Sequence, residues 1–160
     1  MSATVRSLAR AIAAAIVLML AGAAAAEGFK PYPGAVKYTP PDTEETRQWN
    51  GTLRPGVTIT AYLTSDSLEK VVAFYKGFAR EYTSAGARAP KRLPGGQEVR
   101  MAFLILDGAP DPWSSRSWIN IRHPFVAPQS LKGGASGAAD VRDVTEIVLT
   151  QRQDIKKPQK

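Results

Sequence analysis

A serine and a lysine three positions apart are the first residues whose spacing suggests chemistry. Ser67-Leu68-Glu69-Lys70 reads S-x-x-K, the pattern in which a lysine helps to activate a serine in penicillin-binding proteins and class A β-lactamases. The companion motifs of those enzymes, K-T-G and S-D-N, do not occur in the sequence. The capped, solvated start of a helix explains these residues more simply.

His123, the one histidine of the chain, is the second candidate. A serine-type triad needs a histidine held by a carboxylate and touching a nucleophile, and its place before Pro124 at an expected strand end indicates nothing of the kind. Because the chain has no cysteine, we expect no zinc site. Asp107 and Asp111 could hold calcium from a loop, but the EF-hand pattern is absent and turn chemistry explains them. We expect no metal, no cofactor and no catalytic residue.

Aromatic and arginine side chains recur at alternate positions of three expected strands. We expect the helix to cover the sheet face that carries Val57, Ile59, Ala61, Leu63, Met101, Phe103 and Ile105. The opposite face would then carry Thr58, Thr60, Tyr62, Arg100, Trp118, Asn120 and Arg122. Rings interleaved with arginines resemble the stacking platforms that bind bases or sugars. We take Tyr62, Arg100, Trp118, Asn120 and Arg122 as candidate ligand-binding residues.

Two other interpretations of that face remain open. Exposed Tyr, Trp and Thr side chains also stabilise a sheet through cross-strand pairs, at about 0.2–1 kcal/mol per pair. The preceding proline-rich segment or a glycine-rich loop could instead cover the face.

The elements that must position these residues follow from periodicity. Residues 57–64 alternate apolar and polar side chains, which predicts a half-buried strand. A helix should follow, with Asp66 as N-cap and Glu69 completing a capping box. Its apolar face would be formed by Leu68, Val71, Val72, Tyr75 and Phe78.

Three further strands are predicted at 99–106, 117–122 and 144–150. Consecutive strands favour antiparallel pairing. The order strand-helix-strand-strand-strand therefore predicts an α+β, two-layer fold, with a sheet of about four strands and one main helix on one face.

The rest of the chain is expected to be irregular. Residues 27–56 hold five of the twelve prolines and predict an extended lead-in, in which Asn50-Gly51 predicts a tight turn. Residues 57–152 would form the single domain, with a mobile glycine-containing loop at 127–139. Residues 153–160 read as a polar tail.

Three short motifs lie between residues 32 and 76. They are Tyr32-Pro33-Gly34-Ala35, then Thr64-Ser65-Asp66-Ser67, then Val71-Val72-Ala73-Phe74-Tyr75-Lys76. These motifs resemble those of a group of small secreted bacterial proteins of uncharacterised function. They match a "YPGA" opening and a T-x-D-S…V-x-x-F-Y-K strand-to-helix junction. The resemblance covers about residues 31–80. It implies export and the fold, and it implies no activity.

The first 26 residues have the three parts of a secretory signal peptide. Arg6 and Arg10 precede an apolar run at 11–20, and small residues end at Ala24-Ala25-Ala26. Cleavage after Ala26 would place the protein in the periplasm or outside the cell. The alternative is an uncleaved anchor, although residues 11–26 are short for a membrane span.

Removing Arg6 and Arg10 from the 21 basic side chains leaves 19 against 14 acidic ones, a net charge of +5. That charge favours anionic partners, or it only keeps the protein soluble. We expect an exported, non-enzymatic binding or accessory domain for a periplasmic protein, an anionic glycan or a lipid headgroup, and no nucleic acid. One alternative is a small envelope hydrolase that uses carboxylates or Ser67 and Lys70. The other is an envelope protein anchored by its N-terminus.

Overall fold

The computed structural model of the chain describes residues 28–51, 53–83, 89–93, 96–127 and 141–153. The predicted signal peptide lies outside these residues. So do 128–139 of the predicted mobile loop and 154–160 of the predicted tail. Within the described ranges, no helix combines the length and the apolar character that crossing a bilayer requires.

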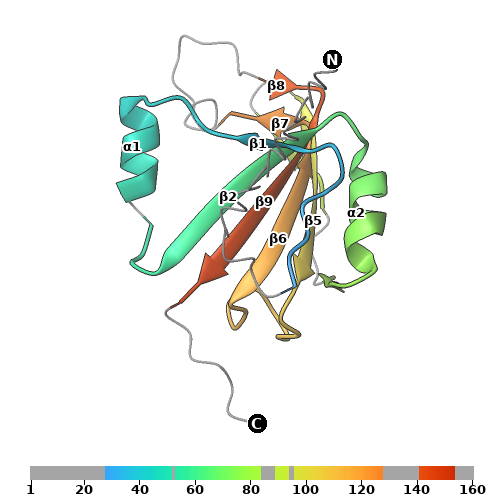
Figure 1. Ribbon diagram of the computed structural model, residues 1–160. Coiled ribbons are helices and arrows are strands. Elements are labelled where there is room, and N and C mark those ends of the chain that lie inside the picture. Colours follow the sequence, from blue (N-terminus) through green and yellow to red (C-terminus); the bar gives the residue numbers. More distant parts are fainter. Residues whose placement is uncertain (1–27, 52, 84–88, 94–95, 128–140, 154–160) are drawn as a thin grey trace, which may run out of the picture.

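An antiparallel sheet runs through the molecule, with seven strands among the described residues (Figure 1). Its path is β1-β2-β9-β6-β5-β3, and β4 also pairs with β5. The strands are β1 (Val36–Tyr38), β2 (Val57–Thr64), β3 (Arg80–Tyr82), β4 (Lys91–Arg92), β5 (Glu98–Ile105), β6 (Ser117–His123) and β9 (Thr145–Arg152). A separate pair joins β7 (Phe125–Val126) to β8 (Val141–Arg142).

The antiparallel α+β architecture is therefore confirmed, whereas the expectation of about four strands is wrong. The four long strands β2, β5, β6 and β9 lie close to the four ranges in which the sequence predicted strands. β1, β3 and β4 have two or three residues each, which is too short for a period of two to become visible in a sequence.

Helix α2 (Leu68–Lys76) packs on one face of the sheet, over β5 and β6. Its N-cap is Ser67, whose hydroxyl accepts a hydrogen bond from the Lys70 backbone N–H at 3.3 Å. The prediction of Asp66 as N-cap is wrong by one residue. The carboxylate of Asp66 instead accepts hydrogen bonds from two side chains, described below.

The proline-rich lead-in is more structured than predicted. It contains β1 and a second helix, α1 (Glu44–Gly51), which stands beside the β2 edge in Figure 1. Thr43 begins this helix, because its side chain accepts a hydrogen bond from the Thr46 backbone N–H at 3.2 Å. Asn50 and Gly51 form the last turn of α1 and not the predicted tight turn.

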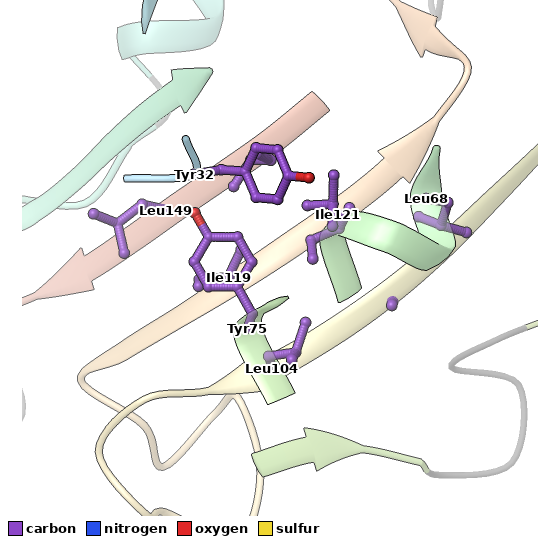
Figure 2. Packing of buried hydrophobic residues seen from close by; sticks show 10 residues of the cluster. Tyr32, Leu68, Tyr75, Leu104, Ile119, Ile121 and Leu149 are labelled. Atoms are coloured by element: carbon purple, nitrogen blue, oxygen red, sulfur yellow. The ribbon is translucent and has the colours of Figure 1, made fainter. Parts of the chain in front are cut away.

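The main core lies between α2 and the sheet (Figure 2). Three residues of α2 project onto side chains from β5, β6 and β9, and Tyr32 of the lead-in joins them. The buried members are Tyr32, Leu68, Val71, Tyr75, Ala102, Leu104, Ile119, Ile121, Ile147 and Leu149. Side chains alternate between the two faces along a strand. The buried positions therefore determine on which face each of the remaining strand residues lies.

The register makes the predicted assignment of faces wrong for two strands. Tyr62 pairs with Ile147 and Ala102 pairs with Ile121, so these positions lie on the α2 face. The odd-numbered residues of β2 and β5, predicted to lie under the helix, point the other way. We call the sheet face turned away from α2 the outer face. Its central members are Ile59, Ala61, Leu63, Met101, Phe103, Ile105, Trp118, Asn120, Arg122, Glu146, Val148 and Thr150.

Candidate functional site

The five predicted ligand-binding residues do not share one face. Trp118, Asn120 and Arg122 lie together on the outer face, as expected from the alternation of β6. Tyr62 lies on the α2 face, where it packs partly buried against the core with its ring 5.7 Å from that of Phe29. Arg100 lies on the α2 side too, and its guanidinium pairs with Glu69 of α2 at 2.5 Å.

Arg122 forms an ion pair with a buried carboxylate on the neighbouring strand. It stands directly across from Glu146 of β9, and the two side chains form an ion pair. The side chain of Glu146 is 4% exposed and that of Arg122 is 26% exposed. Burying a carboxylate is costly unless a cation accompanies it, so the first role of Arg122 is to neutralise Glu146.

Asn120 and Trp118 occupy the middle of the outer face. Asn120 stands between Phe103 and Val148 on the neighbouring strands. Its side-chain oxygen is buried and has no hydrogen-bond partner among the described residues. An unpaired buried polar atom costs free energy, so this amide is held in the sheet at a cost to stability. Trp118 is half-buried one row further along the face.

The small β7–β8 pair closes one end of the outer face. The fully buried ring of Phe125 meets the ring of Tyr38 edge-on, with centroids 5.0 Å apart. Tyr38 stands across from Ala61, so its side chain belongs to the outer face. In Figure 1, β7 and β8 lie at the top, where β9 begins. The opposite end of the outer face, which β7 and β8 do not close, is the end at which β9 finishes.

That remaining end holds arginines that were not predicted, and we call it the arginine end: Arg80, Arg116, Arg152, Trp113 and Trp118. Arg80 stands across from Ile105 on the outer face. The Arg152 backbone N–H donates to the Arg116 carbonyl at 2.8 Å, which places these two arginines directly opposite each other. Arg116 continues the alternation of Trp118 and Asn120, so the sequence contained this signal. Arg80 is placed by the pairing of β3 with β5, and Trp113 is placed by the loop between β5 and β6. Neither placement can be predicted from a local pattern in the sequence.

The loop between β5 and β6 folds around its two aspartates. The Asp107 carboxylate accepts hydrogen bonds from the Ser115 hydroxyl at 2.8 Å and from the Arg116 backbone N–H at 2.6 Å. Partial burial opposes ionisation, but these hydrogen bonds outweigh it and lower the pKa of Asp107. Hydrogen bonds from Ser114 likewise lower the pKa of Asp111. Turn chemistry thus accounts for both, and the described residues contain no cluster of three or more potential metal ligands.

The S-x-x-K residues form the start of α2, and the lysine there forms an ion pair with Asp66. The Lys70 ammonium lies 2.8 Å from the Asp66 carboxylate, and this hydrogen bond raises the pKa of Lys70. A lysine that activates a serine needs a lowered pKa to accept a proton. The Ser67 hydroxyl serves as N-cap acceptor. The geometry therefore opposes the pair as a nucleophile and its base.

His123 lines a pocket of about 420 Å³ with Gln97, Glu98, Arg100, Pro124, Val141 and Asp143. Its Nε2 lies 3.2 Å from the Asp143 carboxylate and its Nδ1 lies 3.1 Å from the Thr145 hydroxyl. This chain of contacts resembles a triad in outline. However, Thr145 is fully buried and its hydroxyl donates to the Asp66 carbonyl at 2.6 Å. Thr145 is therefore inaccessible as a nucleophile.

The three motifs that resemble a family pack against one another. Tyr32-Pro33-Gly34-Ala35 forms a turn closed by the Ala35 N–H to Tyr32 carbonyl bond at 3.0 Å, with Gly34 at φ +75°. The Tyr32 hydroxyl donates to Asp66 at 2.7 Å, and its ring meets Phe74 edge-on at 5.1 Å. These motifs therefore build the junction between the lead-in, β2 and α2. They supply packing and not chemistry.

Comparisons with protein-family models, with curated proteins and with solved structures found no match to this chain.

Proposed function

We propose that the protein is an exported binding domain that holds a periplasmic protein or an anionic envelope ligand on its outer face. The observation that carries this proposal is the partly buried outer face and the side chains that it gathers. It combines tryptophans and arginines with the amide oxygen of Asn120, which is buried and has no hydrogen-bond partner among the described residues. Trp and Arg are the side chains that most often anchor protein interfaces.

Charge and export support the same proposal. The 1–26 segment has the composition of a signal peptide, and the chain that follows it carries a net charge of +5. An excess of positive charge raises the rate at which anionic partners associate. At the arginine end, Arg80 and Arg152 donate hydrogen bonds to backbone carbonyls of Ala109 and Trp113.

The hydrolase alternative has weaker support. The Lys70 ammonium is bound by Asp66, and the Thr145 hydroxyl beside His123 is buried. Neither group offers an accessible, activated nucleophile. A binding role needs neither.

A capture experiment tests the binding role. The tagged protein, purified after export, is incubated with periplasmic extract of its own bacterium at low and at high salt. Trp118→Thr keeps a residue that favours strands and removes the ring from the outer face. Ala73→Gln, on the exposed side of α2, is the control. Arg122 is left intact because its removal would leave the buried Glu146 carboxylate without a cation.

We expect the Trp118→Thr variant to lose the captured species and the Ala73→Gln variant to retain it. Both variants must first show the parent protein's circular dichroism and unfolding midpoint. Capture that is unchanged in Trp118→Thr would contradict a role for the outer face.

A further inference from the structure

His123, at the end of β6, has an oxygen atom within hydrogen-bond distance of each of its ring nitrogens. Nδ1 lies 3.1 Å from the hydroxyl of Thr145, the first residue of β9. Nε2 lies 3.2 Å from the carboxylate of Asp143, which belongs to the turn between β8 and β9. Which nitrogen of a histidine carries hydrogen depends on the hydrogen bonds that the ring makes. These two contacts therefore determine the protons of the imidazole.

The Thr145 hydroxyl requires a hydrogen on Nδ1. A hydroxyl group has a single hydrogen to donate, and Thr145 donates its hydrogen to the Asp66 backbone carbonyl at 2.6 Å. Its oxygen is then an acceptor toward His123. Nδ1 must consequently carry a hydrogen both when the ring is charged and when it is neutral.

The Asp143 carboxylate requires a second hydrogen, on Nε2. An ionised carboxylate only accepts hydrogen bonds, so its contact with Nε2 is attractive only when Nε2 is a donor. A ring with hydrogen on both nitrogens is the positively charged imidazolium. The neutral ring would instead turn the Nε2 lone pair toward Asp143, and two acceptors repel each other. The observed arrangement is thus that of the protonated histidine.

The other charged side chains around His123 are bound elsewhere. Arg100 stands directly across from His123 on β5 and brings a like charge near the imidazolium, but Glu69 offsets that charge. The neighbouring charged groups and their partners are Glu98 with Arg92, Arg100 with Glu69, Asp66 with Lys70, Glu146 with Arg122, and Arg142 with the ring of Phe125. Among the described residues, Asp143 is the carboxylate that forms an ion pair with the imidazole.

The contact with His123 ties the turn between β8 and β9 to the end of β6. Backbone hydrogen bonds also hold this turn, from the Phe125 N–H to the Val144 carbonyl at 2.9 Å and from the Val144 N–H to the Arg142 carbonyl at 2.8 Å. The Asp143 side chain itself is 98% exposed, so it is free to turn into water when the contact is lost. His123 and Asp143 both line the pocket of about 420 Å³.

We propose that His123 and Asp143 form a proton-dependent latch, which holds the turn between β8 and β9 against the end of β6. The protonated imidazole donates from Nδ1 to Thr145 and from Nε2 to Asp143. When the Nε2 proton passes to water, the bond to Thr145 remains and Asp143 is released. The pocket then offers a lone pair on Nε2 and an unpaired carboxylate to a ligand. The inference does not rest on the proposed function, because it concerns this pocket and not the outer face.

NMR spectroscopy of the ¹⁵N-labelled protein, purified after export without a histidine tag, tests the latch. Histidine ordinarily changes its charge between about pH 5 and pH 8, which is the range to be scanned. The spectra of the imidazole nitrogens show which of them carries hydrogen, and His123 is the one histidine of the chain. The backbone amide signal of Val144 reports on the turn. The variant is Asp143→Asn. The control is Asp42→Asn, which removes the same charge from a side chain that is 86% exposed.

We expect the neutral ring to carry its hydrogen on Nδ1 at the alkaline end of the scan. The Val144 amide signal should shift together with the imidazole signals, in the parent protein and in Asp42→Asn alike. Asp143→Asn should lose most of the Val144 shift. A carboxamide accepts from a protonated Nε2 through its oxygen and donates to a neutral Nε2 through its nitrogen, so the contact persists in both states of the ring.

Three results would overturn the inference. A neutral ring with its hydrogen on Nε2 would mean that the Thr145 hydroxyl does not determine the tautomer. A Val144 signal that does not follow the imidazole signals would show that the turn is not held by His123. Equal losses of the shift in Asp143→Asn and Asp42→Asn would assign it to the overall charge of the protein.

Discussion

Replacing Arg122 with leucine should destabilise the protein strongly, because it leaves the Glu146 charge buried without a partner. The carboxylate side chain is 4% exposed, and breaking such a pair from one side costs about 3–5 kcal/mol. Arg122 is itself 26% exposed, so some water reaches the pair and we expect the lower end, about 3 kcal/mol. Against a total stability of about 5–15 kcal/mol, this is a large loss.

The chain offers a matched control in Arg92→Leu. Arg92 also stands directly across from a glutamate, Glu98, on a neighbouring antiparallel strand. Its side chain is 74% exposed and that of Glu98 is 49% exposed. An exposed pair contributes at most about 1 kcal/mol. The two substitutions therefore differ in burial and in little else.

Urea unfolding followed by circular dichroism measures both effects. With a slope of about 1.5 kcal/mol per molar urea, Arg122→Leu should lower the midpoint by about 2 M. Arg92→Leu should lower it by less than about 0.7 M. The double variant Arg122→Leu/Glu146→Leu should recover most of the free energy of unfolding that Arg122→Leu loses, because no buried charge remains without a partner. Equal shifts for the two single variants would refute the reasoning.

Three further outcomes are expected. Tyr75→Phe should change the free energy of unfolding by less than about 1 kcal/mol, because the buried Tyr75 hydroxyl has only the Tyr32 backbone to offset its burial and no hydrogen bond of normal geometry among the described residues; a loss of more than about 1 kcal/mol in urea titrations would contradict this. Hydrogen bonds from Lys70 and Tyr32 hold the pKa of Asp66 below its usual 3.8, so its contribution to stability is complete above pH 3.8 and is lost as the pH falls through the lower folded value. Asp66→Asn should therefore flatten stability measured between about pH 5 and pH 2, and a curve parallel to the parent's would argue against it. Mass spectrometry of the exported protein should find Glu27 at its N-terminus, whereas a mass that includes residues 1–26 would support the anchor alternative.

Alternation placed some residues correctly and failed where the pattern was ambiguous. β6 alternates between isoleucines and larger polar or aromatic residues, and Trp118, Asn120 and Arg122 were placed on the correct face. β5 is almost continuously apolar, so its period could not distinguish its two faces. Its odd-numbered residues were consequently assigned to the wrong side.

The misplacement of Tyr62 has a long-range cause. Its strand alternates clearly, but which side is the core depends on what covers it. The lead-in supplies Phe29 and Tyr32 beside α2, and Tyr62 packs there. No local sequence pattern predicts this contact between the lead-in and Tyr62. The same limit applies to Arg80 and Trp113, which join the arginine end through the pairing of β3 and through a loop.

The outer face as a binding surface is tested most directly by photo-crosslinking in living cells. A photoreactive benzophenone amino acid replaces Trp118 on the outer face in one strain and Ala73 on the exposed side of α2 in the other. After irradiation, adducts of higher mass are sought on gels. We predict adducts from position 118 and none from position 73. Adducts from position 73 alone, or from neither position, would contradict the proposal that the outer face binds a partner.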